Sequence, residues 1–135
     1  MYAYLWYELD NDALKIGVGE VPAERMLAYA VQFGLRPEPR SLTTIEIPRG
    51  EAIRVYNHLL DIYIEGLDLR LVDGFADLYR VGNRYTFPDL RGLFMMVVRD
   101  IAAFTNEPNE RRQRRMKELC IERVHEWRDI NNGGH

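Results

Sequence analysis

Three side chains that can act on a phosphate group lie near a pair of glycines early in the chain. Tyr4 stands in an aromatic stretch, Lys15 lies two residues before Gly17, and Arg25 lies six residues after Gly19. A guanidinium or an ammonium stabilises charge on phosphoryl oxygens, and a phenol can position or activate water. The segment "ALKIGVGEVPAERML" is therefore compatible with a phosphate-binding loop, a nuclease site or an ordinary turn.

The two glycines do not form a known nucleotide-binding motif. A dinucleotide-binding loop requires a third glycine where Pro22 stands, and it requires a parallel strand-helix-strand unit. A Walker loop requires a Gly-Lys-Ser/Thr sequence, which does not follow Gly19. An ordinary turn remains an alternative for this pair of glycines.

The first third of the chain has the pattern of a hairpin followed by a helix. Residues 2–9 and 13–18 are apolar and aromatic around the turn-forming "DND", so we expect two antiparallel strands. Pro22 suits the first turn of a helix and Gly34 its end. The apolar residues spaced for one helical face are Met26, Leu27, Ala30 and Val31.

The remaining elements follow from the same patterns. "SLTTIEI" predicts a third strand, and Pro48-Arg49-Gly50 leads into a helix that is expected to end near Gly66. "GFADLYRV" predicts a short strand or an extended segment, and "PDLRGLFMMVVRDIAAF" a largely buried helix. The helix that ends near Gly66 is expected to carry an apolar stripe of Ile53, Tyr56, Leu60 and Tyr63. A last helix is expected to carry a second stripe of Met116, Leu119, Cys120, Val124 and Trp127.

These elements predict an α+β fold in the order β-β-α-β-α. We expect a small, three-stranded, mainly antiparallel sheet flanked by helices, with a helical C-terminal extension. Residues 1–105 would form the domain, residues 106–130 a helix packed on the domain or on a second copy, and residues 131–135 a frayed tail.

Composition limits the class of protein. With 135 residues, 47% of them hydrophobic, the chain can form one domain with a core. No apolar run reaches the roughly 20 residues that span a bilayer, so we expect a soluble, cytoplasmic protein. The single Cys120 and three scattered histidines give neither a disulfide nor zinc-ligand spacing.

Charge is distributed unevenly along the chain. The net charge is −3, but from Arg91 to Arg128 there are nine basic and six acidic residues, a local excess of three positive charges. Such a segment could face nucleic acid, or it could be an ordinary solvated helix face. The basic cluster consists of Arg111, Arg112, Arg114, Arg115 and Lys117.

Taken together, the motifs of the first half resemble the GIY-YIG nuclease superfamily, especially its phage-type branch. The resemblance depends on "YAY" at residues 2–4, on Lys15-Ile16-Gly17, and on Pro22 with Arg25 in "VPAERML". It covers about residues 1–82. It implies a metal-dependent endonuclease that acts on DNA, with Tyr4 near the nucleophilic water, Arg25 on the phosphate and Lys15 as a second cation.

The resemblance also implies a histidine and a metal-binding glutamate on the second helix. His58 matches the histidine, but Arg54 stands where the glutamate is usual, and Glu51 lies one turn earlier on nearly the same face. Glu51 would then hold one Mg²⁺ or Mn²⁺, with Asp77 the next candidate. We expect Tyr4, Lys15, Arg25 and Glu51 to meet in one shallow cleft.

Tyrosine has an unperturbed pKa of about 10, so a base at Tyr4 would need Lys15 and Arg25 to lower its pKa. Ordinary structural roles remain alternatives. Tyr4 could be part of a packed aromatic face, Arg25 a surface residue, His58 a half-buried histidine, and Glu51 a partner of the helix dipole.

Two other classes of function compete with the nuclease. A catalytically silent GIY-YIG-like fold could bind nucleic acid or another protein, and Arg54 favours this alternative. A structural homo-oligomer could instead pack through the C-terminal helices and use no site.

Overall fold

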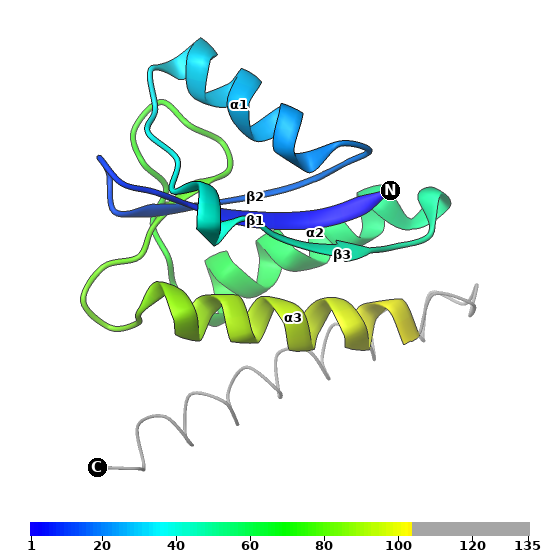
Figure 1. Ribbon diagram of the computed structural model, residues 1–135. Coiled ribbons are helices and arrows are strands. Elements are labelled where there is room, and N and C mark those ends of the chain that lie inside the picture. The colour runs from blue at the N-terminus through cyan, green and yellow to red at the C-terminus, as the bar shows by residue number, and fades with distance from the viewer. Residues whose placement is uncertain (104–135) are drawn as a thin grey trace.

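The structure is a computed structural model and describes residues 1–103. The chain forms an α+β fold in which one antiparallel sheet lies between helices, and the predicted fold class is confirmed (Figure 1). Helix α1 covers one face of the sheet, whereas α2 and α3 lie on the other. The predicted last helix, the tail and the basic cluster lie outside the described residues.

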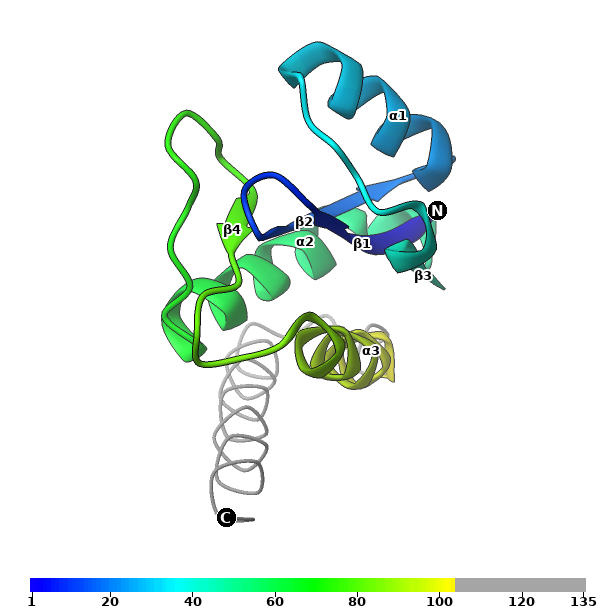
Figure 2. The ribbon, with the colours of Figure 1, turned by 60° about the vertical axis from the view of Figure 1, so that its left-hand side comes forward.

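The sheet has four strands, in the order β3-β1-β2-β4. Strands β1 (Tyr2–Glu8) and β2 (Ala13–Gly19) form the predicted hairpin, and β3 (Thr43–Glu46) pairs with β1. The prediction of three strands is wrong by one, because β4 (Leu78–Arg80) pairs with residues 13–15 of β2. Figure 2 shows β4 at this edge of the sheet.

Residues 3–6 of β1 are all buried because helices cover both faces of the sheet. Successive side chains point to opposite faces of a strand. Ala3 and Leu5 pack in the main core beneath the sheet, whereas Tyr4 and Trp6 pack with Met26 under α1. The residues that carry the candidate chemistry therefore face α1.

Glu8 holds the β1–β2 turn against the segment that follows α1. Its side chain is fully buried and accepts hydrogen bonds from the backbone N–H groups of Asn11 at 2.6 Å and Arg36 at 3.0 Å. Burial alone would raise the pKa of this carboxyl, but these bonds lower it overall. The hairpin is thus fixed at the end opposite Gly17 and Gly19.

Helix α1 (Pro22–Phe33) begins and ends where the sequence predicts. Pro22 is in the first turn, and Gly34 ends the helix in the left-handed conformation, with φ of 65°. Met26 and Ala30 are buried, but Leu27 and Val31 are 58% and 85% exposed. Only two of the four residues of the expected apolar face are therefore buried, because the helix contacts the sheet through a narrow stripe.

The second helix buries only part of the stripe expected for it: Tyr63 is fully buried and Leu60 packs on the core, but Ile53 does not. Helix α2 (Ala52–Asp61) follows a short 3-10 turn (Arg49–Glu51) and continues into a π-helical turn (Ile62–Gly66). Ile53 is 77% exposed, whereas Val55 and Leu59 are fully buried against the sheet and α3. Tyr56 consequently lies at the side of the helix, facing the sheet edge described below.

Helix α3 (Phe87–Ala103) closes the core, as its apolar sequence predicts. Leu90, Leu93, Phe94, Val97 and Val98 are fully buried. The hydroxyl of buried Tyr63 donates a hydrogen bond of 2.8 Å to the Leu90 carbonyl, which links the π-helical turn to α3.

Candidate phosphate-binding site at the edge of β2

A pocket of about 300 Å³ lies beside β2, between α1 and the segment that leads into β4. Strand β4 covers only residues 13–15 of β2, so the outer edge of β2 at Gly17 and Gly19, on the side away from β1, has no partner strand among the described residues. Three predicted site residues meet in this pocket. Its lining residues are Tyr4, Lys15, Arg25, Ala28, Tyr29, Gln32, Phe33 and Asp77.

The glycines of the opening motif give space to Tyr4 and Arg25. Tyr4 pairs with Gly17 across the hairpin, so both face α1. A Cβ atom on Gly17 would lie 2.4 Å from the Tyr4 hydroxyl, which is closer than a Cβ atom approaches a non-bonded atom in protein structures. A Cβ on Gly19 would lie 3.6 Å from Cγ of Arg25, an ordinary contact. Gly17 is thus required by the Tyr4 ring rather than by a phosphate loop.

Tyr4 is 4% exposed, and this burial favours the neutral form of its phenol. Burial raises its pKa above the usual 10, although the charge and hydrogen bonding of the Arg25 guanidinium act in the opposite direction. The lowering that a general base would need is therefore not found. A neutral phenol in this place is a hydrogen-bond donor to an anion or a water molecule.

Lys15 is also buried, and its ammonium group is already bound. It forms an ion pair with Asp77, donates a hydrogen bond of 3.1 Å to the Ile16 carbonyl, and lies 4.6 Å from the centre of the Tyr29 ring. Burial lowers the pKa of Lys15, and the Asp77 carboxylate partly offsets this effect. Lys15 consequently supports the pocket wall and is not a free cation for substrate.

Asp77 joins three elements that are distant in the sequence. Besides Lys15, it accepts hydrogen bonds of 3.2 Å from the hydroxyls of Tyr29 on α1 and Tyr56 on α2. Burial and the Asp77 charge raise the pKa of both phenols, so both remain donors. We call these four residues the Asp77 cluster: Lys15, Tyr29, Tyr56 and Asp77.

The roles of Tyr29 and Tyr56 have no signal in the sequence. Tyr29 lies on a helix with several aromatic and apolar residues, and Tyr56 belongs to a predicted apolar stripe. Their common partner is 48 and 21 residues away in the chain. Only the packing of α1 and α2 against the same sheet edge brings these hydroxyls together.

Arg25 is the exposed cation of the site. In the described part of the chain, no carboxylate lies within ion-pairing distance of its guanidinium. It lines the pocket beside Tyr4 and also a neighbouring pocket of about 550 Å³ next to Gly19. A phosphate in the pocket beside Tyr4 could therefore accept hydrogen bonds from Arg25, whereas the neighbouring pocket is also lined by the carboxylates of Glu20 and Glu24.

Glu51 and His58 do not line the pocket. Glu51 accepts a hydrogen bond of 2.7 Å from Nε of Arg54 and forms an ion pair with the same guanidinium. His58 is half-buried and lies two residues after Tyr56, about 200° around the helix axis. The structure thus brings together Tyr4, Lys15 and Arg25 and does not place Glu51 or His58 among the residues lining their pocket.

The described residues fit a phosphate better than a divalent cation. Mg²⁺ or Mn²⁺ requires hard oxygen ligands, and Asp77 is the one carboxylate among the residues that line the pocket. Its oxygens are already bound by Lys15 and two phenols. Among the described residues there is also no group of three possible metal ligands. We therefore derive no chemical step through a metal ion.

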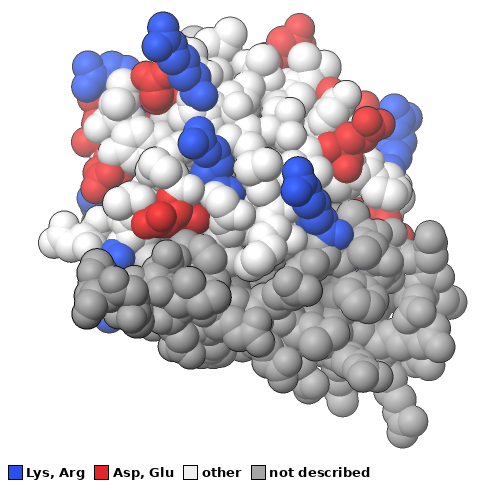
Figure 3. Space-filling view, turned by 60° about the horizontal axis from the view of Figure 1, so that its bottom comes forward, with Lys and Arg blue, Asp and Glu red and all other residues white. Residues whose placement is uncertain are grey.

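Charges of both signs are scattered over the face that Figure 3 shows, where basic side chains stand among acidic and uncharged ones. This face carries no large basic patch among the described residues. Arg111, Arg112, Arg114, Arg115 and Lys117 fall outside the described residues, so their predicted contact with nucleic acid stays a prediction.

Comparison of the chain with protein-family models, with curated proteins and with solved structures returned no match. A search for membrane spans in the part of the chain that the structure describes identified no helix with the length and apolar character needed for one.

Proposed function

We propose that this protein is a small endonuclease of the GIY-YIG type that hydrolyses DNA phosphodiester bonds, and that the Mg²⁺ or Mn²⁺ ion implied by the resemblance would have to be held by groups outside the Tyr4–Arg25 pocket. One observation carries the proposal. Tyr4 and the exposed Arg25 line the same pocket, and Gly17 leaves room for the Tyr4 ring where any side chain would collide with it. This is the pair of residues that the motif resemblance predicts.

Each side chain has a role that follows from its surroundings. Arg25 is exposed and without a carboxylate partner among the described residues, so it can bind the non-bridging phosphoryl oxygens and stabilise the charge that develops on them. Tyr4 is neutral and can donate a hydrogen bond to the attacking water or to an oxygen of the phosphate. The ion pair of Lys15 and Asp77 forms part of the pocket wall beside Tyr4 and Arg25.

The test is incubation of the purified protein with supercoiled plasmid DNA, with Mg²⁺ or Mn²⁺ and with a chelator. We expect nicking that requires the ion and that falls on the order of 10²–10³-fold in Arg25→Ala. Arg36→Ala is the matched control, because Arg36 is exposed and paired with Asp10 on the hairpin side of the molecule. Equal nicking by both variants would contradict the role of Arg25.

A catalytically silent binding module is the second candidate, and specific contacts favour it. Glu51 forms an ion pair with Arg54, and Asp77 is bound by three side chains. Both carboxylates are therefore already occupied by protein partners. Such a protein would bind DNA through Arg25 and cut nothing. Salt-sensitive DNA binding that Arg25→Ala weakens, without nicking under any metal condition, would support this candidate over the enzyme.

A further inference from the structure

A third pocket, of about 290 Å³, lies at the Arg80 end of β4. It forms between residues 67–70, which follow the π-helical turn, and residues 80–85, which follow β4. These two segments are held together by a 2.8 Å hydrogen bond from the Arg80 N–H to the Arg70 carbonyl. Both segments turn sharply, at Asp68 with φ of 55° and at Gly82 with φ of 72°.

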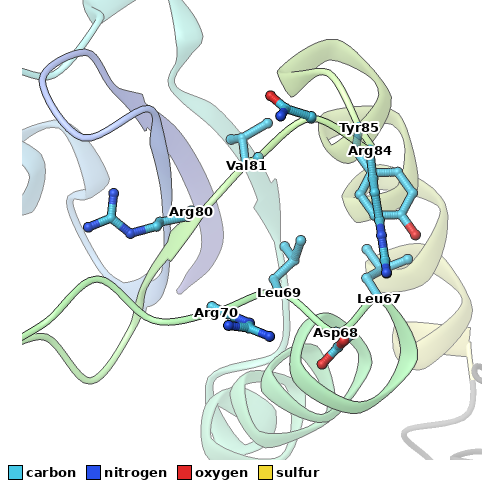
Figure 4. A pocket seen from close by; sticks show the side chains of 10 residues that line it. Leu67, Asp68, Leu69, Arg70, Arg80, Val81, Arg84 and Tyr85 are labelled. Carbon is cyan, nitrogen blue, oxygen red and sulfur yellow. The ribbon is translucent and has the colours of Figure 1, made fainter.

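The floor of this pocket is apolar and its rim is basic. Figure 4 shows Arg70 and Arg84 on opposite sides of it, whereas Arg80 points away from it. Both flanking arginines are exposed, and no carboxylate of the described residues lies within ion-pairing distance of them. The floor consists of Leu67, Leu69, Val81 and Tyr85.

This arrangement suits an anion. Arginine is the side chain best matched to phosphate, because its planar group donates two parallel hydrogen bonds. Among the described residues that line the pocket, Asp68 is the one carboxylate, so Arg70 and Arg84 give this part of the lining an excess of positive charge even without Arg80. Proteins bind the phosphates of a nucleic-acid backbone through exposed cationic side chains of this kind.

The place of the pocket relates it to the Tyr4–Arg25 pocket. Asp77 and Arg80 are three residues apart on extended chain, which corresponds to about 10 Å. The floor of the Arg70–Arg84 pocket belongs to the core on the α2–α3 side of the sheet, whereas the Tyr4–Arg25 pocket faces α1, so a nucleic acid that contacts both pockets must pass around the β4 edge of the sheet.

We infer that the pocket between Arg70 and Arg84 binds a backbone phosphate of the nucleic acid whose phosphodiester lies against Tyr4 and Arg25. This inference rests on the proposed function. The pocket would position the strand and add affinity without base recognition, since its positively charged groups are guanidinium ions on exposed loops.

The experiment measures binding of a short fluorescent DNA duplex by anisotropy, with chelator present, from low to physiological salt. Arg70→Gln with Arg84→Gln should weaken binding about tenfold and reduce the slope of log affinity against log salt by about one. Arg36→Gln with Arg40→Gln removes the same charge from exposed positions near the hairpin and should leave both quantities nearly unchanged.

Binding of inorganic phosphate, followed through amide resonances of residues 68–70 and 82–84, identifies the source of the anion. Phosphate binding that the Arg70 and Arg84 changes abolish, with unchanged DNA affinity, would overturn the nucleic-acid assignment in favour of a small anion. DNA binding that depends on Arg25 but not on Arg70 and Arg84 would overturn this inference and leave the proposed function standing. Absence of DNA binding in the wild-type protein would overturn both.

Discussion

Gly17 and Tyr4 face each other across the hairpin so closely that Tyr4 lies where a side chain at position 17 would be. A Cβ atom added to Gly17 would lie 2.4 Å from both Cζ and Oη of Tyr4. Gly17 has no left-handed backbone conformation that would otherwise require glycine. Glycine is required at position 17 because the Tyr4 ring occupies the space of a side chain there. Tyr4 is one of the residues that line the candidate site.

Gly17→Ala should therefore displace Tyr4 from Arg25. The ring is buried under α1, so it cannot move without disturbing its neighbours, and we expect a loss of about 1–3 kcal/mol in the free energy of unfolding. Nicking, if present, should fall at least as much as in a variant that lacks the Tyr4 hydroxyl. Denaturant unfolding and the plasmid assay measure the two effects.

Gly19→Ala is the matched control, because its new Cβ would meet Arg25 and Tyr4 at 3.6–3.7 Å. We expect it to retain nearly wild-type stability. If the two alanine variants were equally stable and equally active, the close approach of Gly17 to Tyr4 would have no functional importance.

Local signals in the sequence predict the elements that local chemistry determines. Pro22 and Gly34 bound α1 because proline fixes the first turn and glycine accepts the left-handed end. The hairpin follows from alternating aromatic residues around a polar turn. The pocket residues Tyr4, Lys15 and Arg25 lie within this local unit, which is why their proximity could be predicted.

Long-range packing determines what could not be predicted from the sequence. Strand β4 has three residues and exists because Leu78 pairs with Lys15, 63 residues earlier. The buried face of α2 depends on α3 as well as on the sheet, so Val55 is buried in place of the predicted Ile53. Asp77 could be named as a carboxylate, but its bonds to Tyr29 and Tyr56 depend on this packing.

Asp77→Asn should destabilise the fold, because it leaves the Lys15 ammonium buried without a counter-charge. Removing one partner of a fully buried ion pair costs about 3–5 kcal/mol, and the partial exposure of Asp77 reduces this to about 2 kcal/mol. Asp73→Asn changes an exposed carboxylate in the same loop and is the control. Equal unfolding midpoints for the two variants would show that the Asp77 cluster contributes little to stability.

Replacing Tyr4 with phenylalanine tests whether the phenol acts as a donor or as a base. Because burial raises the Tyr4 pKa above 10, the group stays protonated at neutral and moderately alkaline pH. We expect Tyr4→Phe to slow cleavage about 10²-fold through loss of a hydrogen-bond donor, with an unchanged shape of the pH–rate profile between pH 6 and about 9. An alkaline rise in rate that disappears in the variant would instead identify Tyr4 as the base.

The same variant has a stability signature that does not depend on activity. A tyrosine with a raised pKa in the folded state contributes stability that is fully present below its unfolded pKa of about 10. That contribution is lost as the pH rises towards the folded value. Tyr4→Phe should therefore lose less stability than the wild type between pH 9 and 11, as denaturant unfolding at each pH would show.

The pair of Glu51 and Arg54 separates the enzyme from the silent module. Arg54 neutralises the carboxylate nearest to the position where the resemblance implies a metal ligand. Arg54→Glu would release Glu51 and place two carboxylates one turn apart on the same side of α2, which is a better donor set for Mg²⁺ or Mn²⁺. Like-charge repulsion between partly exposed groups costs only about 0.2–0.5 kcal/mol, so the fold should persist.

If the wild-type protein nicks plasmid DNA, Glu51→Gln should abolish nicking with little effect on DNA binding, since it removes the charge at nearly constant shape. If the wild-type protein is inert, metal-dependent nicking by Arg54→Glu would show that Arg54 silences an otherwise competent site. Arg49→Glu is the control, because Arg49 is exposed at the start of the same helix and pairs with Glu20 instead. Full activity of Glu51→Gln would place the essential carboxylate elsewhere, and Asp77 is then the residue to test, because it is the carboxylate that lies beside Tyr4 and Arg25 in the pocket.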